Sequence, residues 1–164
     1  MEITNPDGTS ARALRRFAAS PKRMWKAFTD PSDMAHWMWG GFTKRAVAET
    51  NLRVGGRYSV YTDSNATNDG WHTDRIGRLG IYVEIVPEER LVYTLHWDAP
   101  VGYNQKDEPV ADEVFAVAFT ADGDGTVVEV NHYGIPNDGV SAEGHGLGLG
   151  DEMETLARLV EDSR

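Results

Sequence analysis

The segment Thr126 to Pro136, TVVEVNHYGIP, constrains the fold of this chain more than any other. Val128 and Val130 alternate with polar residues, which is the period-two pattern of a strand that is buried on one face. The same alternation puts His132 on the face of the valines. We therefore expect an imidazole on the apolar side of a β-sheet.

Turn residues separate a series of strand-like runs along the chain. The first run is Ala11 to Ala19. The later runs are Lys44 to Thr50, Arg57 to Thr62, Arg78 to Val86, Leu91 to Trp97, Ala111 to Thr120 and Thr126 to Tyr133. Pro87 to Arg90 and Asp122 to Gly125 are short enough to join neighbouring strands as hairpins. Together the runs predict an antiparallel meander.

Two short helices are expected after the first strand. Ser20-Pro21 and Asp30-Pro31 each place an N-cap residue before a proline that suits the first helical position. A longer amphipathic helix is predicted from about Asp151 to Asp162. Its apolar stripe consists of Met153, Leu156, Leu159 and Val160.

Alternating glycines precede the terminal helix, at Gly144, Gly146, Gly148 and Gly150. Each glycine inside a helix costs about 1 kcal/mol relative to alanine. We therefore expect this stretch to be a loop or a frayed helix, mobile beside the stable helix that follows it.

The composition is that of a soluble globular domain. Of the 164 residues, 40% are hydrophobic and 26% charged, and we expect one domain over 1–164 with its core at about 11–162. The formal net charge of −10 argues against nucleic acid or an anionic membrane surface as a partner. No cysteine, signal-peptide pattern or long apolar span occurs, which favours a cytoplasmic location.

Several short motifs occur in the order and spacing of one known family. They are Thr29-Asp30-Pro31, Trp37 with Trp39, Gly55-Gly56, Gly80 with Tyr82, Pro87 with Arg90-Leu91, and Thr126 with Val128, Val130 and His132. Over roughly residues 12 to 162 the chain resembles the START-like (SRPBCC) superfamily. Within it, the resemblance is to bacterial-type single-domain members of the family named after the activator homologue of the heat-shock-protein-90 ATPase.

This resemblance implies an α+β helix-grip fold, as in the birch-pollen-allergen type. Such a fold has a curved antiparallel sheet around a long C-terminal helix, with two short helices after the first strand. A cavity between the sheet and the long helix is implied as well.

Aromatic and methionine side chains are the expected lining of that cavity. Tryptophan combines a large apolar surface with an N–H group, and methionine re-packs around different shapes. A neutral histidine orients a polar group of a ligand or, when desolvated, acts as a base. The candidate ligand-binding residues are Met34, Met38, Trp37, Trp39, Trp71, Tyr82, His96, Trp97 and His132. Packing in the core is the alternative for each of them.

Other kinds of site find no support in the sequence. There is no HExxH, His-x-His or cysteine cluster to predict a metal site, and His72 and His145 are expected in loops. The chain also lacks a phosphate-binding loop and a serine or cysteine nucleophile in a known motif, so we expect no cofactor and assign no catalytic residue.

Three functional hypotheses follow from these observations. The first is binding of a small, largely apolar ligand in the cavity, such as a lipid, a sterol-like or a polyketide-like molecule. The second is an enzyme of the cyclase or aromatase type, in which His132 or Tyr82 moves protons. The third is a protein-interaction module that binds a chaperone, or a second copy of the chain, through its surface.

Overall fold

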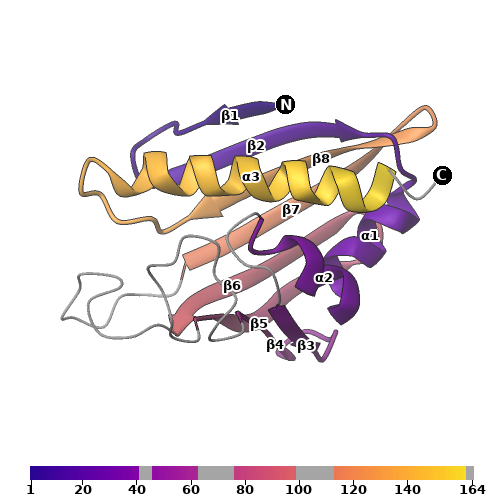
Figure 1. The fold of residues 1–164 in the computed structure, drawn as a ribbon, viewed down its shortest axis with the longest axis horizontal. Helices are drawn as coiled ribbons and strands as arrows, with labels where there is room; N and C mark the ends of the chain where they lie inside the picture. Colours follow the sequence, from indigo (N-terminus) through magenta and orange to yellow (C-terminus); the bar gives the residue numbers. More distant parts are fainter. Residues whose placement is uncertain (41–45, 63–75, 99–112, 162–164) are drawn as a thin grey trace.

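The computed structural model describes residues 1–40, 46–62, 76–98 and 113–161. Within these ranges the chain forms one sheet and three helices (Figure 1). The strands are β1 Glu2–Thr4, β2 Ser10–Phe17, β3 Ala46–Thr50, β4 Arg57–Thr62, β5 Gly77–Val86, β6 Arg90–Asp98, β7 Glu113–Asp122 and β8 Gly125–Tyr133. The helices are α1 Pro21–Thr29, α2 Pro31–Trp37 and α3 Ser141–Glu161.

The sheet is antiparallel, with the strand order β1-β2-β8-β7-β6-β5-β4-β3. From β3 to β8 each strand pairs with the next along the chain, which confirms the predicted meander. The first long strand, β2, then pairs with the last, so that Ala11 lies opposite His132. The sequence analysis missed β1, a three-residue strand at the edge of the sheet beside β2.

Both short helices begin where the cap signals placed them. The Ser20 side chain accepts a hydrogen bond from the backbone N–H of Arg23, which satisfies a donor of the first turn of α1. The Asp30 carboxylate does the same at α2 for the backbone N–H groups of Ser32 and Asp33. Because Asp30 is also the C-cap of α1, one residue ends the first helix and begins the second.

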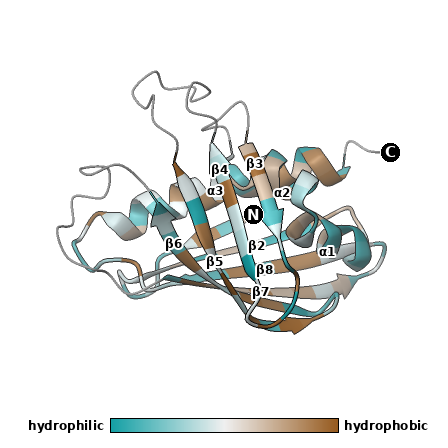
Figure 2. Cartoon of the chain, turned by 90° about the horizontal axis from the view of Figure 1, so that it is seen from below, coloured by the Kyte–Doolittle hydropathy of each residue, from teal (hydrophilic) through white to brown (hydrophobic). Residues whose placement is uncertain are grey.

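The long helix α3 crosses one face of the sheet, and α1 and α2 cover the same face beside it (Figure 1). Figure 2 shows the sheet curving around this side. Met153 and Leu156 of α3 are buried in one hydrophobic cluster with Phe17 of β2 and Val130 of β8. The helix-grip fold is confirmed. None of the described helices is long and apolar enough to cross a membrane.

The expectation of a loop or frayed helix at the alternating glycines was wrong. Helix α3 begins at Ser141 and continues through all four of them to Glu161. The Asp138 carboxylate accepts hydrogen bonds from the backbone N–H groups of Val140 and Ser141, close to the start of the helix. A cap that lies outside the glycine stretch therefore supports its first turn.

Two of these glycines face the strand that the sequence analysis missed. A Cβ atom at Gly146 would lie 3.2 Å from the Asn5 amide and 3.4 Å from the Ile3 side chain, and one at Gly150 would lie 3.8 Å from Ile3. The Asn5 amide donates a hydrogen bond of 2.6 Å to the Ala142 carbonyl at the start of α3. Close packing of the N-terminal segment on α3 explains the small residues on this side of the helix.

Alanine substitutions distinguish the two kinds of glycine. Gly148 has no atom within 4 Å of a built Cβ, so Gly148→Ala should stabilise the protein by about 1 kcal/mol through helix propensity alone. Gly146→Ala gains the same propensity but must displace Asn5, and its net gain should be smaller or negative. Urea unfolding followed by tryptophan fluorescence measures both. Equal stabilisation by the two variants would contradict the close packing at Gly146.

Candidate functional site

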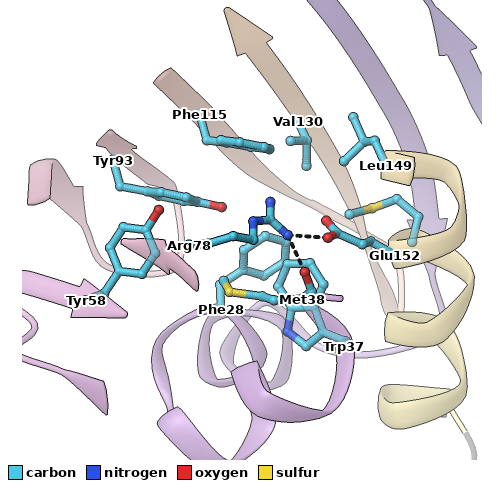
Figure 3. A pocket seen from close by; sticks show the side chains of 11 residues that line it. Phe28, Trp37, Met38, Tyr58, Arg78, Tyr93, Phe115, Val130, Leu149 and Glu152 are labelled. Atoms are coloured by element: carbon cyan, nitrogen blue, oxygen red, sulfur yellow. Dashed lines mark hydrogen bonds and ion pairs between the residues drawn. The ribbon is translucent and has the colours of Figure 1, made fainter. Parts of the chain in front are cut away.

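A small cavity lies on the helix-covered side of the sheet. Its lining comes from strands β4 to β8 and from all three helices, and the cavity has a volume of about 10 Å³. This is room for about one water molecule. Figure 3 shows the lining side chains Phe28, Trp37, Met38, Tyr58, Arg78, Tyr93, Phe115, Val130, Leu149, Glu152 and Met153.

A buried ion pair lies at the centre of this lining. Arg78 of β5 donates hydrogen bonds to the Glu152 carboxylate of α3 and to the Met38 carbonyl after α2 (Figure 3). The side chains of Arg78 and Glu152 are only 8% and 13% exposed. A single guanidinium thus bonds the sheet to both the long helix and the end of a short one.

Aromatic rings surround the guanidinium. Its central carbon lies 5.6 Å from the ring centroid of Trp39, 5.4 Å from that of Trp97 and 5.5 Å from that of Phe115. A cation within about 6 Å of a ring face is attracted by the quadrupole of the ring. The ring of Tyr93 stacks on Phe115, with centroids 5.4 Å apart. These contacts compensate part of the hydration that Arg78 loses on burial.

Burial acts differently on the two charges of the pair. It opposes the charge on Glu152 more strongly than Arg78 favours it, and this raises the pKa of Glu152 to about 7. Burial also opposes the charge on Arg78, but Glu152 and the nearby Tyr58 and Tyr93 outweigh it, so the pKa of Arg78 lies above its ordinary value. The arginine therefore stays charged near neutral pH, where its partner takes up a proton.

The structure brings four of the predicted site residues to this centre. Trp37 and Met38 line the cavity, and the Trp37 indole N–H is held by the Ala27 carbonyl at 2.8 Å. Trp39 and Trp97 contact the guanidinium of Arg78.

The other predicted residues lie elsewhere. Met34 is buried in the core but does not line the cavity. The Tyr82 hydroxyl lies 2.7 Å from the Thr50 hydroxyl, and Tyr82 is not part of the lining, although its ring lies 5.7 Å from that of Tyr58, which is. His96 is exposed, so it does not face the cavity as predicted, and Trp71 lies outside the described residues.

His132 faces the interior, as the strand alternation predicted. It is 2% exposed, its ring stacks on Phe115 with centroids 4.1 Å apart, and its Nε2 lies 2.6 Å from the Glu113 carboxylate. Burial lowers the pKa of His132. Burial opposes the charge on Glu113, but hydrogen bonds from His132 and Trp97 hold the pKa of Glu113 below its ordinary value. Neither member of this pair lines the cavity; Phe115 does.

Sequence reasoning missed Arg78, Glu152 and Glu113. A signal existed for the first two, because each carries a charge at a position that the local period makes apolar. Arg78 falls on the same strand face as Tyr82, and Glu152 lies four residues before Leu156 of the apolar stripe. A charge at such a position is buried only if the fold places a partner of opposite charge beside it.

A curved antiparallel sheet that holds a C-terminal helix and encloses a cavity defines the START-like, helix-grip class of proteins. The chain matches the Activator of Hsp90 ATPase homolog 1-like protein family over residues 18–161 and belongs to that family. Hydrophobic ligands are commonly bound in this family.

Solved structures from several bacteria are similar to this one. A protein from Chromobacterium violaceum is 26% identical, with a TM-score of 0.73 and coverage of 94% of this chain and 99% of that one. Proteins from Rhodobacter sphaeroides and Arthrobacter aurescens are each 17% identical, with TM-scores of 0.76 and 0.75. The former match covers 99% of both chains, and the latter covers 98% of this chain and 91% of that one. No curated protein matches the chain.

The raised pKa of Glu152 has a measurable consequence for stability. Between its ordinary value of 4.5 and about 7, the folded protein keeps a proton at Glu152 that the unfolded chain has released. The stability that the protonated Glu152 contributes is therefore fully present below pH 4.5, the pKa in the unfolded chain. It is lost as the pH rises through about 7, the pKa in the folded protein. Glu152→Gln cannot ionise. From about pH 5 to about pH 8, its unfolding free energy should rise relative to that of the unmodified protein, by up to roughly 3 kcal/mol.

Urea unfolding at a series of pH values measures this difference. Glu154→Gln is the matched control, because Glu154 lies on an exposed position of the same helix, 2.7 Å from Arg15. The unfolding free energy of Glu154→Gln should differ from that of the unmodified protein by about the same amount at each pH. An equal slope in the control, or a flat difference for Glu152→Gln, would contradict the assignment.

Proposed function

We propose that this protein binds a small, largely apolar ligand that carries an anionic group, between the sheet and α3. The observation that supports this most is the buried guanidinium of Arg78 inside an aromatic lining. Aromatic and aliphatic walls with a few polar groups are typical of small-molecule sites. The lack of cysteine favours the cytoplasm as the setting for this binding.

The ion pair gives the ligand's anionic group a place to bind. An isolated buried charge is costly, so Arg78 needs a partner in the absence of ligand, and Glu152 supplies it. Because the pKa of Glu152 is about 7, this carboxylate can be neutralised by a proton with little loss of free energy near neutral pH. A ligand carboxylate or comparable anion would then bind the guanidinium in its place, with charge-assisted hydrogen bonds.

The cavity must widen to hold such a ligand. A volume of about 10 Å³ is far below the roughly 300 Å³ at which small-molecule sites begin. The side chains of Met38, Leu149 and Met153 line it, and methionine re-packs readily because it is unbranched and flexible. The proposal therefore includes a rearrangement of α2 and α3 side chains when the ligand binds.

The two other hypotheses have less support. A cyclase-type reaction needs a side chain that moves protons beside the ligand, but neither Tyr82 nor His132 lines the cavity. A chaperone-binding or self-associating module would use exposed apolar side chains such as Ile81 and Val83 of β5, which are 42% and 49% exposed, but no described feature of them specifies a partner. Binding without reaction is the function that the geometry favours.

Two fluorescent probes of similar shape test the role of Arg78. Anilinonaphthalene sulfonate carries an anionic group, whereas phenylnaphthylamine is its uncharged counterpart. Both should bind and quench the tryptophan emission, because Trp37, Trp39 and Trp97 surround the site. Arg78→Met should weaken sulfonate binding by roughly 10-fold to 100-fold and leave phenylnaphthylamine nearly unchanged. Glu152→Gln should strengthen sulfonate binding.

Controls separate this effect from a loss of folding. Arg90→Met removes an arginine whose side chain is 46% exposed and paired with Glu84 at 2.9 Å, and it should leave both affinities unchanged. The double variant Arg78→Met/Glu152→Leu removes the pair without leaving an unpaired buried charge. Equal losses for the two probes would show that Arg78 acts only in packing, and no binding of either probe would contradict the proposed function itself.

A further inference from the structure

We propose that Glu113, His132 and His145 form a binding site for a divalent transition-metal ion, for which Zn²⁺ is the best fit. One ligand atom from each residue lies within 4.8 Å of the other two. The carboxylate comes from β7, one imidazole from β8 and the other from α3. This proposal goes beyond ligand binding at Arg78 and does not depend on it.

The separations are close to those of a metal centre. The Glu113 Oε2 atom lies 2.6 Å from Nε2 of His132 and 3.8 Å from Nε2 of His145. Zinc bonds of about 2.0 to 2.2 Å to nitrogen and oxygen imply separations near 3.3 Å between tetrahedral ligands. One distance is shorter and the other longer than this value. The third separation, between the ligand nitrogens of the two histidines, is at most 4.8 Å. Side-chain shifts of about 1 to 1.5 Å would therefore form the site.

The hydrogen bonds of His145 prepare it as a ligand. Its Nδ1 lies 2.7 Å from the Ser141 carbonyl oxygen, which places the proton on Nδ1. The lone pair of Nε2 is then free to bind a metal on the side of Glu113. Metal-binding histidines nearly always donate their other ring N–H to a carbonyl or carboxylate in this way. Trp97 supports the third ligand, since its indole N–H donates to the Glu113 Oε2 atom at 3.2 Å.

The burial of the cluster suits a metal site with one open position. The side chains of His132 and Glu113 are 3% and 8% exposed, whereas that of His145 is 25% exposed. An ion would reach the buried pair from the side of His145, and a water molecule or ligand atom would complete its coordination. His132 would bind through Nε2 and remain neutral by carrying its proton on Nδ1. This choice of ligands, two imidazoles and one carboxylate, occurs in zinc enzymes.

The alternative is a structural hydrogen bond between Glu113 and His132 with His145 packed against it. In the described part of the chain every buried side-chain nitrogen and oxygen has a hydrogen-bond partner, so the pair is stable without an ion. A metal measurement separates the two possibilities, because a structural pair binds no ion specifically.

Titration of the metal-free protein with Co²⁺ and Zn²⁺ tests the site. We expect one equivalent of Co²⁺ to produce the visible absorption of a nitrogen- and oxygen-ligated ion and Zn²⁺ to displace it. His145→Gln should lower the affinity for both ions by about 100-fold or more, and Trp97→Phe by about 10-fold. Zn²⁺ should also raise the midpoint of thermal unfolding of the unmodified protein but not of His145→Gln.

The chain offers a matched control for His145. His36 in α2 also has its Nδ1 2.7 Å from a carbonyl four residues earlier, that of Ser32, but it is exposed and not part of the cluster. His36→Gln should leave the affinity unchanged. Circular dichroism checks that each variant is folded, and His145→Gln changes a partly exposed side chain. The proposal is overturned if the unmodified protein binds no more tightly than His145→Gln, or if His36→Gln weakens binding as much.

Discussion

The ion pair between Arg78 and Glu152 is the polar contact that joins the sheet to the helices at the centre of the inner face. It joins β5 to α3, and its hydrogen bond to the Met38 carbonyl adds the end of α2. Removing one partner of a buried pair typically costs several kcal/mol, whereas replacing both by apolar residues is often neutral. Stability alone therefore does not explain why charges occupy the centre of this core. The proposed binding of an anionic ligand would account for the charges, since such a ligand needs a desolvated cation.

A second polar pair, Glu113 with His132, lies near the first on the inner face of the sheet. Phe115 contacts both centres, because its ring stacks on His132 and lies 5.5 Å from the Arg78 guanidinium carbon. Aromatic contacts keep water from the charges and strengthen the electrostatic interactions among them. The inner face is thus an apolar surface with two small polar centres, which is the kind of surface that orients a bound molecule.

The sequence was informative about the apolar part of the candidate site and poor about the polar part. Trp37 and Met38 line the cavity, and the large, apolar character of their side chains was enough to mark both as candidates. His96 was misplaced because side chains alternate along β6: Leu95 and Trp97 take the inner face, so His96 points to the other one. Arg78 and Glu152 were missed because neither has a local signal stronger than a charge at an apolar position. Their partnership exists only across two elements that are far apart in the chain.

The sequence by itself determined the strands from β2 to β8, the two capped helices and the inward direction of His132. Each of these follows from a local rule: side chains alternate along a strand, and cap residues satisfy the first N–H groups of a helix. The tertiary structure decided that α3 continues through its glycines, because Gly146 and Gly150 pack against the N-terminal segment at Ile3. Only the tertiary structure, likewise, brought His145 beside Glu113. Both contacts join residues that are close in space but distant in the sequence. Local rules of alternation and capping do not describe such contacts, because in this fold the helix crosses strands from other parts of the chain.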